Sequence, residues 1–482
     1  MLRLLQSLLR FPRHLRLLTP AKLLLGFILF ALFIAVQSTH HPHSILESQE
    51  EQSRLSALRP DELSAQYEDA RLHLLESFDP IRAASLVKSP AQLPSGGNTF
   101  DISVATYCNR LRSFVDSHFS TSPVRDQLLA SIEMVAQRRP PRSEDLPKNV
   151  YSTSPDGSAT EAFELWSKLL PIPLGPNLLR LLHDDPGADP WNVVVASDDD
   201  VDRLMSEWTG EIVNRGVPES KPWSRLWGHL SFGVLRADIF RYTAMLCSGS
   251  IYADSDTAPI AHPYLWGIDA QSILPPDLAA IMPHLDTYHP PYVRRPPPSI
   301  THPDISLVVA VEWDSTIAYD WWRLFMWTPL RWRRARDDVY ARRLELVQYL
   351  LMAKPYHPVF LDLLATISEN LELGHMQDLG AIELTGPGPF STDAVLRYLL
   401  VQYGVTPESL RDLRGPVRIG DVIILQEESL LAPHSAIRRL LSHVSRMRGD
   451  PWLFGEGYRS WRSGGTRVAF HGLAGTWKNQ GW

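Results

Sequence analysis

From residue 146 onward, short apolar runs alternate with amphipathic stretches along the chain. The short runs predict strands at residues 192–196, 251–253, 306–312 and 422–425. Apolar positions at helical spacing predict helices at residues 234–247, 339–352, 357–373 and 392–401. Strands that alternate with helices are typical of an α/β domain. No glycine-rich fingerprint follows the first strand, so the pattern does not indicate a dinucleotide-binding fold.

The N-terminal segment has a different pattern. The first 22 residues carry only basic charges, and an apolar run follows from Leu23 to Val36. Such a run is slightly short of the roughly 20 residues that span a typical bilayer, which suits the thinner early secretory membranes. The positive-inside rule predicts that residues 1–22 are a cytoplasmic tail and 23–39 a transmembrane signal anchor, with the remainder in the lumen. A cleaved signal peptide is the alternative, but no small-x-small cleavage site follows the run.

The rest of the chain divides into two parts. Residues 40–144 contain mostly polar helical segments and end in the turn-rich stretch 138–142, which predicts a helical stem before an α/β domain at 145–482. Of the 482 residues, 44% are hydrophobic and 21% are charged, the composition of a folded soluble protein. The net charge of -7 argues against a nucleic-acid partner. Cys108 and Cys247 are too few for a disulfide framework, and the sequence leaves open whether they pair.

Two carboxylates, Asp254 and Asp256, follow directly after the strand predicted at residues 251–253. Ligands bind at such strand ends in open α/β sheets, and alternate residues of an extended chain point to the same side. Carboxylate oxygens suit Mn²⁺ or Mg²⁺, and a cation held there neutralises a diphosphate leaving group. Taken alone, an Asp-x-Asp pattern is more often a solvated turn.

An acidic and a basic residue lie in the helix predicted immediately before that strand. Asp238 and Arg241 are three residues apart, so both side chains share one helical face. A helix that enters the Asp-x-Asp strand can present a carboxylate to sugar hydroxyls and a guanidinium to phosphate. The alternative is a structural ion pair within the helix.

Motifs along the domain occur in a recognisable order. Residues 237–242 read A-D-I-F-R-Y and residues 249–256 read G-S-I-Y-A-D-S-D. These stretches resemble the core signature of glycosyltransferase family 32, S/A-D-x-x-R-Y followed by G-G-I-Y-x-D-x-D, with Ser250 in place of the second glycine. Further stretches resemble the fungal initiation-specific α-1,6-mannosyltransferases of that family: 146–153 is similar to I-P-K-x-I-W-Q-T, 342–358 to a helix and A-K-P-x-H-P, 385–394 to a T-G-P loop, and 471–478 to H-x-x-x-G-S-W-K.

The resemblance implies a fold and a donor site. It implies a GT-A-type nucleotide-sugar-binding fold with a central mixed sheet, and a transferase that retains the anomeric configuration. Asp256 is then a direct metal ligand. Asp254 binds donor hydroxyls and the metal, while Asp238 and Arg241 hold and position the donor sugar and act in catalysis.

Four more residues receive roles from the resemblance. His471 is a candidate metal ligand and Trp477 a candidate to close over the donor diphosphate, although both are also common structural side chains. Residues 311–314 look like the family's I-E-A-D, which places Glu312 and Asp314 at the acceptor as catalytic candidates. The route stays open between same-face attack, with the leaving phosphate taking the proton, and a covalent carboxylate intermediate.

The implied reaction moves mannose from GDP-mannose to a lumenal glycan, with an α-1,6 linkage, in protein glycosylation at the Golgi membrane. The cofactor would be Mn²⁺ or Mg²⁺, and a mannosyltransferase complex is an expected partner because family members often work in such complexes. Transfer to a sphingolipid head group and a catalytically silent subunit are the alternatives. The Trp- and Arg-rich stretch 321–336 departs from the family and is either an acceptor or membrane contact or an aromatic mini-core.

Overall fold

The computed structural model describes residues 103–431 with gaps, residues 468–471, and a few positions between 54 and 69. The gaps lie at 142–145, 172–189, 214–220, 231–232, 274–299, 303, 315–341, 343, 373–380, 406, 411–412, 414 and 427–428. The predicted tail, the predicted anchor, Trp477 and the segment 321–336 lie outside the described residues. In the part of the chain that is described, no helix has the length and apolarity to cross a membrane.

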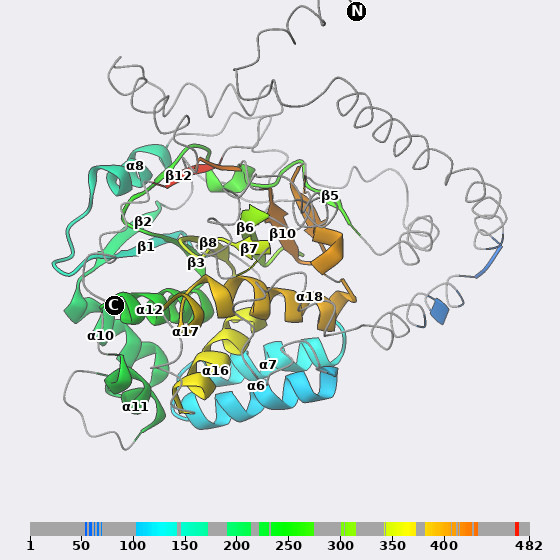
Figure 1. Cartoon of the computed structure of the whole chain (residues 1–482), viewed down its shortest axis with the longest axis horizontal. Helices are drawn as coiled ribbons and strands as arrows, with labels where there is room; N and C mark the ends of the chain where they lie inside the picture. Colours follow the sequence, from blue (N-terminus) through cyan, green and yellow to red (C-terminus); the bar gives the residue numbers. More distant parts are fainter. Residues whose placement is uncertain are drawn as a thin grey trace, which may run out of the picture. The chain divides into compact units, whose positions relative to one another are not determined.

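A nine-stranded sheet forms the centre of the compact unit Asp69–Ala279 and Pro291–Trp482 (Figure 1). The strand order is β2 (Asn192–Ala196), β1 (Asn149–Thr153), β3 (Ser250–Ala253), β8 (Leu350–Ala353), β6 (Leu307–Asp314), β10 (Val422–Leu425), β9 (Val417–Ile419) and β5 (Gln271–Ser272), and β7 (Leu344–Leu346) pairs with β6. β1 is parallel to β2 and β3, β10 is parallel to β6, and β8 is antiparallel to β3 and β6. The carboxyl ends of β2, β1, β3, β6 and β10 therefore share one edge, and the prediction of an α/β fold with a mixed sheet is confirmed.

Both faces of the sheet are covered, which explains why its strands read as continuous apolar runs. Along β3, Tyr252 belongs to the core on one face, whereas Ile251 and Ala253 belong to the core on the other. The first core includes side chains from α6 (Val104–His118), α7 (Arg125–Ala136), α10 (Asp198–Thr209), α11 (Pro222–His229), α12 (Gly233–Cys247), α16 (Pro358–Glu372) and α18 (Val395–Tyr403). The second core contains Trp166 of α8 (Glu161–Leu169).

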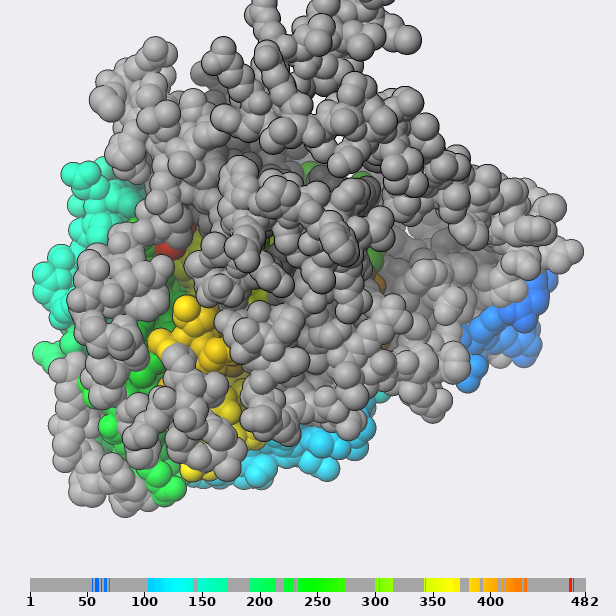
Figure 2. Space-filling model, viewed as in Figure 1, coloured from blue at the N-terminus to red at the C-terminus, as the bar shows by residue number. Residues whose placement is uncertain are grey.

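Two helices from the segment predicted as a stem pack into the first core. α6 and α7 bury Leu111 and Ile132 there, and their outer surfaces lie together (cyan in Figure 2). Arg110 of α6 pairs with Asp362 of α16, whose other carboxylate oxygen accepts a hydrogen bond from Arg397 of α18 at 2.9 Å. These helices thus belong to the same folded unit as the sheet, while the domain boundary between residues 144 and 145 stays a prediction.

The prediction of a helix at residues 339–352 is wrong, and so is the expectation of a helix there from the family resemblance. The segment forms β7 and β8, joined by a bend at Gln348 and Tyr349. Both faces of these strands are buried, and a short apolar run of this kind does not distinguish a buried strand from a buried helix. The other three predicted helices are present as α12, α16 and α18, and a π-helical turn at Gly388–Ala394 precedes α18.

The two cysteines are both buried and free. Burial raises the pKa of each thiol, that of Cys108 and that of Cys247. Buried thiols with raised pKa values are poor nucleophiles, so both act here as small apolar side chains.

The strand that leads to the two carboxylates begins in a strained conformation. Gly249 and Ser250 have positive φ angles of 69° and 87°. A Cβ on Gly249 would lie 2.6 Å from the backbone nitrogen of Pro355, so this position requires glycine. Ser250 carries a Cβ in this disfavoured region, and its hydroxyl accepts from the Asn149 N–H at 2.8 Å and lies 2.5 Å from the Pro147 carbonyl. These bonds tie the start of β3 to β1.

Two substitutions of Ser250 separate the energetic cost of its strained φ from the contribution of its hydrogen bonds. Ser250→Ala keeps the strained Cβ and loses the bonds, so we expect the free energy of unfolding to fall by about 1–3 kcal/mol. Ser250→Gly loses the same bonds but relieves the strain, so a smaller change is expected. Urea unfolding of both variants checks this, and equal losses would show that the strain at this residue is negligible.

Candidate functional site

The two carboxylates lie in a tight turn between β3 and β4 (Thr257–Pro259). The Asp254 N–H donates to the Tyr349 carbonyl at 2.9 Å, and the Thr257 N–H donates to the Asp254 carbonyl at 2.8 Å. From the second core, the indole N–H of Trp166 donates to the Thr257 carbonyl at 3.0 Å. Hydrogen bonds from both sides therefore fix the backbone that carries Asp254 and Asp256.

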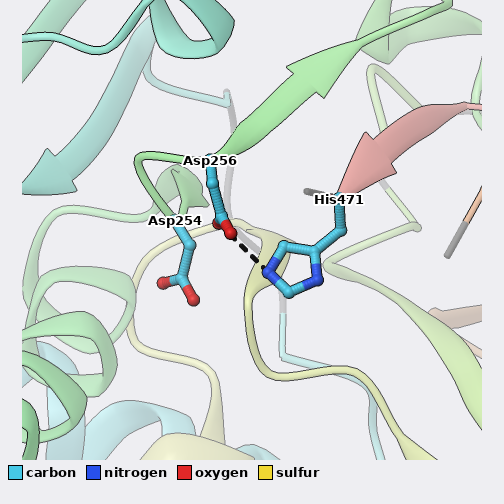
Figure 3. Close-up of side chains that lie close together, drawn as sticks. All are labelled: Asp254, Asp256 and His471. Atoms are coloured by element: carbon cyan, nitrogen blue, oxygen red, sulfur yellow. Dashed lines mark ion pairs between the residues drawn. The ribbon is translucent and has the colours of Figure 1, made fainter. Parts of the chain in front are cut away.

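His471 reaches the turn from the C-terminal part of the chain. It ends β12 (Ala469–His471), which pairs antiparallel with β4 and parallel with β11 (Leu430–Leu431), and it lies opposite Thr257 in that register. Its Nε2 is 3.1 Å from Oδ1 of Asp256 (Figure 3). One ligand atom from each of Asp254, Asp256 and His471 lies within 4.8 Å of the others. The structure thus brings together the three residues that were predicted as metal ligands.

The donor types of this triad suit a divalent cation, and the 3.1 Å between His471 and Asp256 is the spacing of adjacent ligands. An octahedral ion with ligands at about 2.1 Å holds adjacent ligand atoms about 3 Å apart and opposite ones about 4 Å apart. Two carboxylates with one imidazole suit Mn²⁺, and the carboxylates alone suit Mg²⁺. The Asp254 and Asp256 side chains are 28% and 24% exposed, which leaves their oxygens accessible to a ligand.

Arg241 connects this triad to the helix beneath it. The Nη2 atom of Arg241 donates to Oδ1 of Asp254 at 2.8 Å, and Nη1 lies 3.3 Å from Oδ1 of Asp238. The guanidinium also lies over the Tyr252 ring, 4.7 Å from its centroid. The predicted i,i+3 pair is therefore present as an ion pair, but Arg241 additionally reaches the first carboxylate of the Asp-x-Asp turn.

Asp238 is held at both carboxylate oxygens. Oδ1 faces Arg241, and Oδ2 accepts a hydrogen bond from the Thr385 hydroxyl at 2.8 Å. Only 3% of the residue is exposed, and this burial raises its pKa to about 7 against the opposing effects of the Arg241 charge and the Thr385 hydrogen bond. The carboxyl group is thus close to its midpoint of ionisation at neutral pH.

Burial and neighbouring charges also shift the pKa values of Asp254 and Arg241. Burial raises the pKa of Asp254, and the neighbouring Arg241 opposes the shift. Burial alone would lower the pKa of Arg241, but Asp254, Tyr252 and Asp238 reverse this and raise it well above its usual value. Arg241 is therefore a permanent positive charge between two carboxyl groups.

The predicted acceptor residues lie at the same edge of the sheet as the triad. Glu312 and Asp314 are half-buried residues near the end of β6, which is separated from β3 by β8 alone. At this end of β6 the paired strand is β7, with a register shift between Val311 and Trp313. β3 and β6 run in the same direction, so Glu312 and Asp314 lie at the same edge of the sheet as Asp254.

Two residues of the site were not predicted from the sequence. Thr385 lies in the stretch that resembles a T-G-P loop, but nothing in that motif indicated a contact with Asp238. Tyr349 contacts the triad through its carbonyl and its ring, and it fell in the segment wrongly predicted as a helix. In both cases the contact depends on how distant segments pack, which local spacing does not show.

Comparisons with known proteins agree with the motif resemblance. No family model matches the chain. A curated protein of Schizosaccharomyces pombe named "Initiation-specific alpha-1,6-mannosyltransferase" is 29% identical over 264 residues, which are 53% of this chain and 50% of that protein. A protein of Saccharomyces cerevisiae named "Putative glycosyltransferase HOC1" is 27% identical over 216 residues, 42% of this chain and 43% of that protein. The resemblance to initiation-specific α-1,6-mannosyltransferases is thereby confirmed.

The alignments with these relatives cover only part of each chain. A third, from Candida albicans and named "Initiation-specific alpha-1,6-mannosyltransferase", is 23% identical over 276 residues, 52% of this chain and 55% of that protein. The chain therefore matches about half the length of each of these relatives. A solved structure described as "PaToxG Glycosyltransferase" aligns with 59% of this chain and 78% of its own at a TM-score of 0.27 and 13% identity, too remote a likeness to assign the fold.

The raised pKa of Asp238 predicts a pH-dependent contribution to stability. Folding favours the protonated carboxyl, so its contribution is full below about pH 4 and is lost as the pH rises towards about 7. The free energy of unfolding of the wild type minus that of Asp238→Asn is therefore expected to decrease over this range and to be constant above it. Urea unfolding in metal-free buffer checks this, and a difference that increases with pH would show that Asp238 is buried as a carboxylate.

Proposed function

We propose that this chain is a metal-dependent, retaining mannosyltransferase with a GT-A-type fold. It transfers mannose from GDP-mannose to a lumenal glycan through an α-1,6 linkage, in the Golgi membrane. The observation that carries this proposal is the convergence of Asp254, Asp256, His471 and Arg241 at the carboxyl edge of the sheet. The names of the relatives support the sugar and the linkage, and the apolar run 23–36 supports the membrane anchor.

In this proposal the donor diphosphate lies at the triad. Asp254, Asp256 and His471 would hold Mn²⁺ or Mg²⁺, which would supply positive charge to neutralise the leaving diphosphate. Arg241 adds a permanent positive charge next to the same position. Asp238 orients Arg241 and so positions the donor sugar through that guanidinium.

The acceptor approaches from the β6 end of the same edge. Glu312 or Asp314 orients the acceptor hydroxyl, whose oxygen forms the new bond to the anomeric carbon while its proton passes to the departing phosphate. A covalent route needs a carboxylate free to attack, and both oxygens of Asp238 are already occupied by Arg241 and Thr385. These contacts argue against Asp238 as the nucleophile of a covalent intermediate.

Asp256→Ala tests the site assignment. The variant is expected to lose Mn²⁺-dependent hydrolysis of GDP-mannose on the order of 100-fold, several kcal/mol of transition-state stabilisation, because it removes one ligand from the triad. Its melting temperature is expected to stay near that of the wild type, because Asp256 lies in a turn outside the cores. Asp116→Ala removes an exposed carboxylate of α6 and serves as the matched control.

The outcomes separate the alternatives. Normal hydrolysis by Asp256→Ala would contradict the assignment of the metal site. No turnover of any nucleotide-sugar by the wild-type chain would instead support the catalytically silent subunit. A screen of nucleotide-sugar donors followed by linkage analysis of the product tests the sugar, the base and the α-1,6 linkage directly.

A further inference from the structure

Tyr349 lies in the bend between β7 and β8, and its ring packs flat on the imidazole of His471. The two ring centroids are 3.7 Å apart and the ring planes differ by 8°. Tyr349 is 5% exposed, so the contact is buried on the side of Tyr349. Two rings in this arrangement are in full van der Waals contact, and rotation of the imidazole about its side-chain torsions would break that contact.

The same residue contacts the Asp-x-Asp turn through its backbone. Its carbonyl accepts the Asp254 N–H at 2.9 Å. The bend itself is fixed from two sides: the Val347 N–H donates to the Ala310 carbonyl at 2.8 Å, and the Tyr242 hydroxyl lies 2.5 Å from Oε1 of Gln348. Tyr349 is therefore a rigidly held residue that touches two of the three residues of the triad.

The imidazole of His471 lacks the support that orients most metal-binding histidines. Such histidines usually donate their second ring N–H to a carboxylate or carbonyl, which fixes the ring plane and the tautomer. The buried Nδ1 of His471 makes no hydrogen bond to any residue that the structure describes. β12 is a three-residue strand at that point, so the backbone contributes little further restraint on the ring.

We infer that Tyr349 is a positioning residue of the metal site: its ring, stacked on His471, holds the imidazole plane so that Nε2 faces Asp256. This inference rests on the metal site of the proposed function. The ring stack takes the place of the second hydrogen bond. Substitutions at Tyr349 isolate the ring, because the backbone carbonyl that accepts from Asp254 remains in every variant.

The test measures Mn²⁺ affinity of the full chain by electron paramagnetic resonance of the free ion, with and without GDP. Tyr349→Leu is expected to weaken Mn²⁺ binding about tenfold, the size of effect seen when supporting groups of metal ligands are removed. Tyr349→Phe keeps the ring and is expected to bind Mn²⁺ within about twofold of the wild type. Tyr107→Leu removes an equally buried tyrosine from α6 and is expected to lower the melting temperature without a change in affinity.

Each outcome has a distinct meaning. Wild-type affinity in Tyr349→Leu would overturn the inference, as would an equal loss in Tyr349→Phe, which would assign the effect to the hydroxyl. If Tyr349→Leu does not fold, Tyr349→Met, a flexible side chain without a ring, replaces it with the same expectation. Absence of Mn²⁺ binding by the wild type would overturn the metal site itself, and the inference with it. If the wild type binds Mn²⁺ and the variants bind it equally well, only the inference about Tyr349 is overturned.

Discussion

The guanidinium of Arg241 is the positive charge that allows two carboxyl groups to lie side by side at the buried end of β3. It contacts Asp254 and Asp238, and its face lies over Tyr252. Without it, the buried carboxyl group of Asp238 would lie beside the half-buried one of Asp254 with no compensating charge, a situation that is relieved by protonation. With Asp256, the site holds three carboxyl groups for one guanidinium. The site therefore keeps an excess of negative charge, which is the property that a divalent cation requires.

The part of the site that is local in sequence could be predicted from sequence. Helix periodicity alone places Asp238 and Arg241 on one face. The position of Asp254 and Asp256 directly after a strand was also predicted, but the two residues lie in a turn and not in the extended chain that the alternation argument assumed. The proximity of the two pairs then follows because α12 leads directly into β3. His471 is different, since only the family resemblance indicated it. A three-residue pairing of β12 with β4 brings it to the turn, and no periodic pattern marks so short a strand.

The part that the sequence did not predict depends on tertiary pairing. The run from Leu344 to Ala353 is mostly apolar and its strands are buried on both faces, so its hydrophobic pattern fits a buried helix as well as two strands. The sheet decides the outcome, because β8 fills the space between β3 and β6 and completes hydrogen bonds with both. The same packing brings the bend at Tyr349 to the triad. The strained φ of Ser250 likewise depends on how β3 meets β1.

Two polar clusters at opposite edges of the sheet differ in how completely they are satisfied. At the amino ends of β6 and β10, the buried Asp421 accepts hydrogen bonds from His357, Ser306, Tyr398 and Tyr403. Burial raises its pKa, but His357, Ser306 and Tyr403 outweigh this and lower it. Such a complete network holds strands in register. At the carboxyl edge, by contrast, Nδ1 of His471 and the Thr257 hydroxyl make no hydrogen bond to described residues. The network around Asp421 is therefore structural, whereas the polar atoms beside the triad that lack a partner among the described residues agree with the proposed site.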